Sequence, residues 1–242
     1  MKQTKMETIN IVMINGQNHK GISYHLGKIF CDEIGKNVKN LDVKEFFLPK
    51  DLNGFCLGCY NCIDDETKCY RHQEKEIILE AMEKADILVF TTPNYCMSVS
   101  AQMKAFLDYY YDLWMTHRPK EWMFKKKAVV FSTSAGAYPS GGLKLMETNL
   151  NGWGISYVKG YGKPVQAKNW QEVSDNKKED LEEEISKLAR KVLNKKVKTT
   201  LKIKIMFKFF RFLHIKGWDS SVEEKKYWDE KGWLGKKRPW KE

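Results

Sequence analysis

The chain has 242 residues, a formal net charge of +11, and 42% hydrophobic residues. This apolar content is enough for a packed core and excludes a globally disordered chain. No apolar run reaches the roughly 18 residues that a membrane-spanning helix needs. The stretch MKQTKMETIN lacks the apolar core of a signal peptide, so we expect a cytoplasmic protein. The excess charge belongs to the tail, because residues 195–242 hold 15 Lys and Arg against 6 Asp and Glu.

The first part of the chain alternates strand and helix patterns. Thr8–Ile14 is an apolar run typical of a buried strand, and a helical pattern follows from about Ile22 to Lys36. The turn between them, Asn15–Ser23, would present backbone N–H groups and a helix N-terminus, which together favour a phosphate. The alternative is a solvated loop in which Ser23 caps the helix. Leu41–Phe47 predicts a second strand, at a sheet edge.

The strongest pattern lies near the middle of the chain. A helical pattern from Glu74 leads into Ile87–Thr92, a short run typical of a strand buried on both faces. Pro93 and a polar loop, Asn94–Ser100, follow it, and apolar residues then recur at a helical period from Met103 to Tyr110. In open α/β sheets, a loop at the carboxyl end of a central strand is where ligands bind.

The alternation continues beyond this segment. Lys127–Thr133 predicts a buried strand, and Ser134–Gly142 is a loop of small residues suited to a planar ligand. Leu143–Leu150 resembles a helix, Trp153–Tyr161 a weak last strand, and Lys178–Lys195 a charged amphipathic helix.

This order of elements predicts an α/β protein with a flavodoxin-like three-layer sandwich. Right-handed crossovers give a five-stranded parallel sheet, and the strand order 2-1-3-4-5 is the flavodoxin-like solution. The loops after strands 1, 3 and 4 would then meet at one edge of the sheet. We expect residues 1–195 to form this domain, with a cysteine loop inserted at 53–70, and residues 196–242 to form a basic, aromatic C-terminal extension.

Four of the six cysteines stand close together, at Cys56, Cys59, Cys62 and Cys69. In a chain without a secretory signal, this spacing favours metal or redox chemistry over structural disulfides. Cys31 falls in a helical pattern and predicts a small core residue, whereas Cys96 follows the central strand, near the expected ligand.

The loops after strands 1, 3 and 4 resemble those of NAD(P)H-dependent FMN reductases, in the branch that includes iron–sulfur flavoproteins. The resemblance covers roughly residues 8–165. Gly21 and Ser23 match the phosphate loop of that family, but Asn18 and Ile22 stand where the family has Arg and Asn. The Pro-x-Tyr motif matches at residues 93–95, the Lys and Asp that follow it match at residues 104 and 108, and the small-residue loop matches at residues 134–137.

The resemblance implies an FMN-dependent oxidoreductase with NAD(P)H as co-substrate. It also implies a homodimer and a small-molecule or protein electron acceptor. The flavin carries the chemistry, so no side chain is assigned as catalytic. The predicted FMN-binding residues are Gln17, Asn18, His19, Gly21, Ile22, Ser23, Thr92, Pro93, Asn94, Tyr95, Cys96, Met97, Ser98, Ser134, Ala135 and Gly136.

For the cysteine loop, the resemblance implies a [4Fe–4S] cluster, which four soft thiolates can hold. Four-cysteine zinc sites also use C-x2-C pairs. In many relatives with a similar loop there is no cluster and the cysteines pack or stay as thiols, so three interpretations stay open. Gly58 would leave the loop backbone free to turn.

Two apolar periods conflict in the tail: Leu201, Ile203 and Ile205 alternate with Lys as in a strand, whereas Ile205, Phe209, Phe212 and Leu213 would form one face of a helix. We favour a helix with Thr200 as its N-cap. We expect this helix to pack on the cysteine loop or on a second subunit, and we favour this packing over contact of the helix with a membrane surface. Tyr227, Trp228 and Trp233 are expected to be docked on some surface, which the sequence does not identify. One alternative function is a flavodoxin-like binding module without FMN that docks a membrane or nucleic acid through its tail. Another is a structural zinc protein. No nucleic-acid partner is expected, because no recognised nucleic-acid module accompanies the basic residues.

Overall fold

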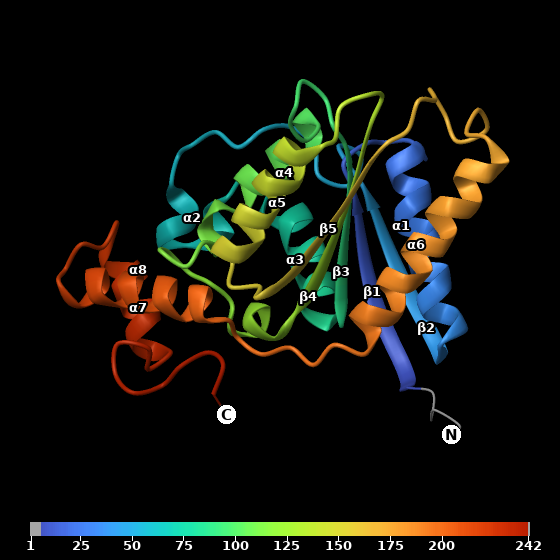
Figure 1. The fold of residues 1–242 in the computed structure, drawn as a ribbon. Helices are drawn as coiled ribbons and strands as arrows, with labels where there is room; N and C mark the ends of the chain where they lie inside the picture. Colours follow the sequence, from blue (N-terminus) through green and yellow to red (C-terminus); the bar gives the residue numbers. More distant parts are fainter. Residues whose placement is uncertain (1–5, 242) are drawn as a thin grey trace.

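Five parallel strands form the centre of the protein, with helices on both faces of the sheet (Figure 1). The computed structural model describes residues 6–241, so the first five residues of the stretch tested for a signal peptide lie outside it. The spatial order is β2-β1-β3-β4-β5, as predicted, and this is the flavodoxin-like arrangement. The strands are β1 (Met6–Asn15), β2 (Val38–Phe47), β3 (Ile87–Pro93), β4 (Lys127–Ser134) and β5 (Tyr157–Pro164).

Alternation along the strands supplies one core on each face of the sheet. Ile11 and Met13 of β1 pack with α1 (Ile22–Lys36) and α6 (Asp175–Leu193). Val12 and Ile14 face the opposite layer. That layer consists of α3 (His72–Lys84), α4 (Ala101–Tyr109) and α5 (Ser140–Gly152). Both faces are therefore covered, which explains why β3 and β4 read as continuous apolar runs.

Shorter elements connect these layers. They are α2 (Asn61–Asp64) and three 3-10 turns, η1 (Glu66–Lys68), η2 (Tyr111–Leu113) and η3 (Glu121–Lys125). Cys31 lies in α1 and is buried in the core between this helix and the sheet, as predicted.

The last strand differs from its predicted bounds. We expected it to begin at Trp153, but Trp153 caps the end of α5 and its side chain is fully buried against Phe106 and Tyr110. Gly154 then turns the chain with a φ of +99°, a conformation that L side chains rarely adopt. The aromatic residue that resembled a strand start is thus a core residue of the preceding helix.

The C-terminal extension folds onto the body beside α2 (Figure 1). It contains α7 (Leu201–Ile215), whose N-cap is Thr200 as predicted, and α8 (Val222–Glu230). Trp228 and Trp233 are buried in a cluster with Phe207 and with Phe124 of the body, which confirms that the tail aromatics are docked. No helix within residues 6–241 is both long and apolar enough to cross a bilayer.

Candidate functional site

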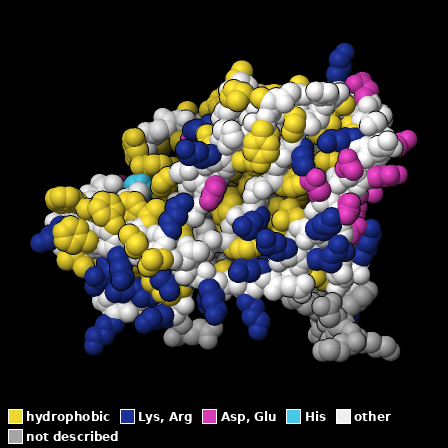
Figure 2. Space-filling view, in the orientation of Figure 1, with side chains coloured by type: hydrophobic (Ala, Val, Ile, Leu, Met, Phe, Trp, Pro, Cys, Tyr) yellow, Lys and Arg dark blue, Asp and Glu magenta, His cyan; other side chains and the backbone are white. Residues whose placement is uncertain are grey.

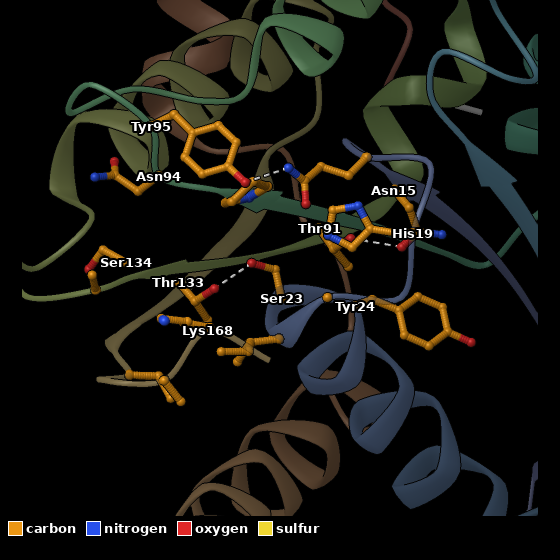
Figure 3. A pocket seen from close by; sticks show the side chains of 17 residues that line it. Asn15, His19, Ser23, Tyr24, Thr91, Asn94, Tyr95, Thr133, Ser134 and Lys168 are labelled. Carbon is orange, nitrogen blue, oxygen red and sulfur yellow. Dashed lines mark hydrogen bonds between the residues drawn. The ribbon is translucent and has the colours of Figure 1, made fainter. Parts of the chain in front are cut away.

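The loops that follow β1, β3 and β4 enclose a cavity of about 240 Å³ at the carboxyl edge of the sheet (Figure 3). This is the edge at which flavodoxin-like sheets hold their ligand. The volume lies just below the usual range for ligand pockets, so a ligand of ordinary size would extend beyond the cleft. Ten of the predicted residues line the cavity, namely Gln17, His19, Gly21, Ile22, Ser23, Pro93, Asn94, Tyr95, Ser134 and Ala135.

The floor of the cavity is a buried polar ladder between β1 and β3. The hydroxyl of Thr91 donates to Asn15 Oδ1 at 2.7 Å, and Asn15 Nδ2 donates to the carbonyl of Phe46 at 3.1 Å. The N–H of Gly16 donates to the carbonyl of Thr91 at 2.7 Å. A Cβ at Gly16 would lie 2.8 Å from Ser100 Oγ, so only glycine allows this close approach. The turn after β1 is therefore held firmly against β3.

The first turn of α1 points into the cavity. Gly21 is its N-cap and no side chain caps it, so the first N–H groups of the helix are left for a ligand. The alternative in which Ser23 caps the helix is wrong, because Ser23 lies inside the helix and its hydroxyl is 2.6 Å from that of Thr133. The arrangement suits an anion such as a phosphate, with the exposed His19 beside it.

The loop after β3 forms a tight hairpin at the cavity mouth. Tyr95 and Ser98 exchange backbone hydrogen bonds of 3.0 and 2.9 Å, and Cys96 and Met97 between them have φ values of 48° and 62°. Gln17 Nε2 donates to the hydroxyl of Tyr95 at 2.6 Å, which ties this loop to the turn after β1 (Figure 3). Asn94 Oδ1 is buried and accepts no hydrogen bond from the described residues, so the cavity wall retains an unused acceptor.

Six predicted residues lie outside the cavity wall. Thr92 is buried behind it, where its hydroxyl accepts from the N–H of Ser100 at 3.0 Å. The others lie in the turn after β1, in the β3 hairpin and in the loop after β4. These residues are Asn18, Cys96, Met97, Ser98 and Gly136. Their roles in binding stay predictions.

The sequence analysis did not predict seven of the lining residues. They are Asn15, Tyr24, Thr91, Thr133, Val165, Ala167 and Lys168. Asn15, Thr91 and Thr133 could have been found, because each stands near the carboxyl end of a strand expected at this edge. The last three come from the loop after β5, which has no periodic pattern, so no signal pointed to Lys168. The pKa of Tyr24 is raised to about 12 by burial and by the charge of Glu45.

The cysteine loop encloses a second cavity, of about 260 Å³, which all four cysteines line. Gly58 and Tyr60 have positive φ values of 63° and 60°, so the backbone turns sharply within the loop. Tyrosine hydroxyls anchor it. Tyr109 donates to the carbonyl of Asn53 at 2.8 Å, and Tyr70 donates to that of Phe55 at 2.7 Å.

A buried ion pair lies near these cysteines. Lys75 Nζ is 3.2 Å from Asp112 Oδ1, and both side chains are about 95% buried, with exposures of 5% and 4%. Burial, and then the charge of Asp112, raise the pKa of Cys62 to about 11. Burial opposes the charge of Lys75, but Asp112, Cys69 and Cys62 outweigh it and raise the pKa of that lysine. Cys62 is thus a protonated thiol unless a metal displaces the proton.

The sulfur atoms are spread out. In the described part of the chain, no three of them lie within 4.8 Å of one another. A tetrahedral zinc with Zn–S bonds of about 2.3 Å would hold sulfurs roughly 4 Å apart. The loop therefore does not present a preformed zinc cage, but all four thiols line one cavity, as the four ligands of an iron–sulfur cluster would.

Comparison with known proteins places this geometry in context. The chain is 29% identical over 100 residues to an iron-sulfur flavoprotein of Clostridioides difficile, covering 40% of this chain and 44% of that protein. It is 26% identical over 132 residues to an iron-sulfur flavoprotein of Archaeoglobus fulgidus, covering 52% and 58%. The matched stretches thus span about half the length of these relatives.

The fold is also found among solved structures. An azoreductase of Bacillus anthracis aligns with a TM-score of 0.58 at 15% identity, covering 76% of this chain and 99% of that one, which is a likeness of fold. The family model described as NADPH-dependent FMN reductase matches residues 9–156, more than half of the sequence. This match spans β1 to α5 and so includes the three loops that enclose the cavity. The chain therefore belongs to the NADPH-dependent FMN reductase family.

Proposed function

We propose that the protein is an FMN-dependent oxidoreductase that takes reducing equivalents from NAD(P)H. One observation carries this proposal. The three loops expected from the sequence to hold FMN line one cavity, at the sheet edge where this fold binds flavin. The uncapped first turn of α1 and the unused acceptor of Asn94 supply donors and an acceptor for such a ligand.

Different residues of the cavity would bind different parts of FMN. The first turn of α1, with Ser23 and His19, would hold the phosphate by hydrogen bonds and charge. Pro93, Tyr95 and Ala135 would confine the flat ring, and the Gln17–Tyr95 hydrogen bond fixes the position of the tyrosine. When bound, FMN supplies hydride and electron transfer, so the protein needs no acid, base or nucleophile of its own.

We also propose that Cys56, Cys59, Cys62 and Cys69 hold a [4Fe–4S] cluster. All four cysteines line one cavity, which supports a single centre held by four thiolates. The likeness to two proteins named iron-sulfur flavoproteins supports it too. A bound cluster supplies one-electron transfer between a flavin and a partner.

The proposal also includes the oligomeric state of the protein. Tyr95, Met97 and Tyr138 are each more than half exposed around the cavity mouth, which favours a second subunit that covers them. We therefore propose a cytoplasmic homodimer that passes electrons to a small molecule or a protein. In this proposal, residues 1–195 form the flavin domain with the loop 53–70 inserted, and residues 196–242 form the extension.

An absorption spectrum of protein purified without oxygen tests both cofactors. Iron, zinc and acid-labile sulfide are assayed on the same sample. Flavin bands, NAD(P)H-dependent bleaching and about four irons per chain are the expected result. Flavin without iron would leave a plain FMN reductase with a thiol loop. A colourless protein that takes up no FMN would refute the oxidoreductase and favour the binding module.

A further inference from the structure

The outer face of α7 is apolar and uncovered. Leu201, Ile205, Phe209 and Phe212 have exposures of 72%, 57%, 55% and 50%, and Trp218, just beyond the helix, has 71%. The helical residues are spaced three or four apart, so they form one stripe along the helix. We call these five side chains the α7 stripe. Single exposed apolar residues are ordinary, but four in a row on one helix face, with an exposed tryptophan just beyond the helix, mark an interaction surface.

The stripe is not the packing face of the helix. Ile203, Phe207 and His214 lie on the opposite side, where they are buried against Trp228 and Phe124. The helix is therefore already held on the protein through one apolar face. The second apolar face contributes nothing to the described core.

Positive charge accompanies the stripe. Residues 185–218 contain no Asp or Glu, while Lys202, Lys204, Lys208 and Lys216 lie on or directly beside α7. Lys208 and Lys216 are exposed and fall on the same side of the helix as the stripe. Figure 2 shows apolar side chains gathered at the end of the molecule that the extension forms, with Lys and Arg side chains along its margin.

We propose that the α7 stripe docks the protein on a bilayer that carries anionic lipids. The stripe would enter the boundary between headgroups and acyl chains, with α7 lying in the membrane plane. The lysines can extend their charged ends to lipid phosphates while their stems stay on the apolar surface. Tryptophan is the residue type enriched at this depth, and Trp218 is exposed just beyond the end of α7.

A second copy of the chain fits this surface less well. Pairing two stripes face to face would bring Lys208 and Lys216 toward the same residues of the other copy. α7 has no acidic side chain that could balance them, and the next acidic residue, Asp219, is largely buried and paired with His214. Like charges opposed across an interface weaken association. An anionic lipid surface supplies the missing negative charge and accepts the apolar stripe.

Vesicle flotation of the full chain tests the proposal. The probes are vesicles of phosphatidylcholine alone and of phosphatidylcholine with phosphatidylglycerol. We expect binding to the anionic vesicles only, weakened by salt. The emission of Trp218 should shift to the blue on binding, and the shift should be absent in Trp218→Phe, which isolates this tryptophan from the other seven.

Two variants separate the apolar and charged contributions. Phe209→Glu with Phe212→Glu should abolish flotation. Lys208→Glu with Lys216→Glu should weaken it at least 25-fold, because each lost lysine is worth about fivefold. Matched controls are Ile77→Glu, an exposed apolar residue of α3, and Lys144→Glu, an exposed lysine of α5, which should leave flotation unchanged. Both target pairs are exposed, so circular dichroism should show intact folding.

Three results would overturn the proposal. One is the absence of binding to either vesicle. Another is binding that the controls weaken as much as the stripe variants do. The third is an oligomer in light scattering that Phe209→Glu with Phe212→Glu dissolves while no vesicle binding is seen, which would assign the stripe to a second copy. None of these results depends on flavin or iron content.

Discussion

The flavin cavity and the cysteine loop are built in different ways. The cavity walls follow strands in continuous register, and its floor is a ladder of hydrogen bonds from Phe46 through Asn15 to Thr91. Residues 55–60 of the cysteine loop, in contrast, adopt no helix or strand, and Cys56 and Cys59 are exposed. One site takes its shape from the fold. The other is held at its ends by Tyr70 and Tyr109 and is open between them.

This difference bears on how each site acquires its ligand. A site on rigid elements loses little conformational freedom when a ligand binds. A loop with few backbone hydrogen bonds belongs to the least stable part of a structure. Metal binding can then order such a loop. We therefore expect flavin binding to survive changes in the cysteine loop, while cluster binding depends on every thiolate.

The largest effect should come from Cys62→Ser. Loss of one of four ligands should reduce iron and acid-labile sulfide nearly to zero, because a hydroxyl is a poor ligand for iron in such clusters. FMN content should stay close to that of the parent protein. Metal analysis and the flavin absorbance measure both. Cys96→Ser is the matched control, since Cys96 is an exposed thiol outside the loop, and its iron content should be normal. Equal iron loss in both variants would contradict the assignment.

Next in size is the effect of Lys75→Met on stability. Removing the lysine leaves the charge of Asp112 buried without its partner, which should cost about 3–5 kcal/mol of unfolding free energy. Urea unfolding measures the loss. The control Lys104→Met breaks an exposed pair with Asp108 and should cost about 0.5 kcal/mol or less. If Lys75→Met is equally mild, the mutation does not leave the charge of Asp112 buried without a partner.

A smaller effect is expected at the cavity from His19→Glu. The new carboxylate lies beside the first turn of α1 and should repel a phosphate, weakening FMN binding about 10- to 100-fold. Quenching of flavin fluorescence measures the affinity. Asn18→Asp adds a negative charge in the same turn but outside the cavity, so it should weaken binding less. A larger effect for Asn18→Asp would place the phosphate elsewhere.

The smallest effect belongs to the ion pair of Glu66 and Lys120, 2.8 Å apart, which joins the cysteine loop to the body. Burial opposes ionisation of Glu66, but the hydrogen bond and charge of Lys120 outweigh it and lower its pKa. A lowered carboxyl pKa stabilises the fold at neutral pH, and this stabilisation is lost as the pH falls below about 4.5.

Glu66→Gln should therefore cost about 1 kcal/mol at pH 7, since both side chains are partly exposed. The difference from the parent protein should shrink as the pH is lowered toward 3. Unfolding free energies across this range measure the effect. A cost independent of pH would show that the carboxylate charge is not what joins the loop to the body.

The sequence was sufficient for the sheet and for much of the cavity. Apolar runs such as Ile87–Thr92 mark strands buried on both faces, and parallel topology then forces their following loops to one edge. Ser134 and Ala135 could thus be assigned to the site before any contact was known. Thr200 was found as a helix N-cap because capping is a local property.

What the sequence could not supply depends on contacts between distant segments. Lys168 reaches the cavity only because β5 directs its following loop there. Trp153 resembles the start of a strand, but its large ring gains more by filling the core beside Phe106. The uncovered side of α7 was equally hidden, because both faces of that helix are apolar and only packing distinguishes them.

The segment between α6 and α7 has a consequence for the continuity of the chain. Residues 195–200 adopt no helix or strand, and Lys195, Lys196 and Lys198 are exposed, so trypsin should cut there first. The two fragments should nevertheless stay together, because Trp228 donates to the carbonyl of His117 and packs with Phe207 against the body. The peptide bond at this point is therefore dispensable for the native form, and a nicked protein should migrate as one species until it is denatured.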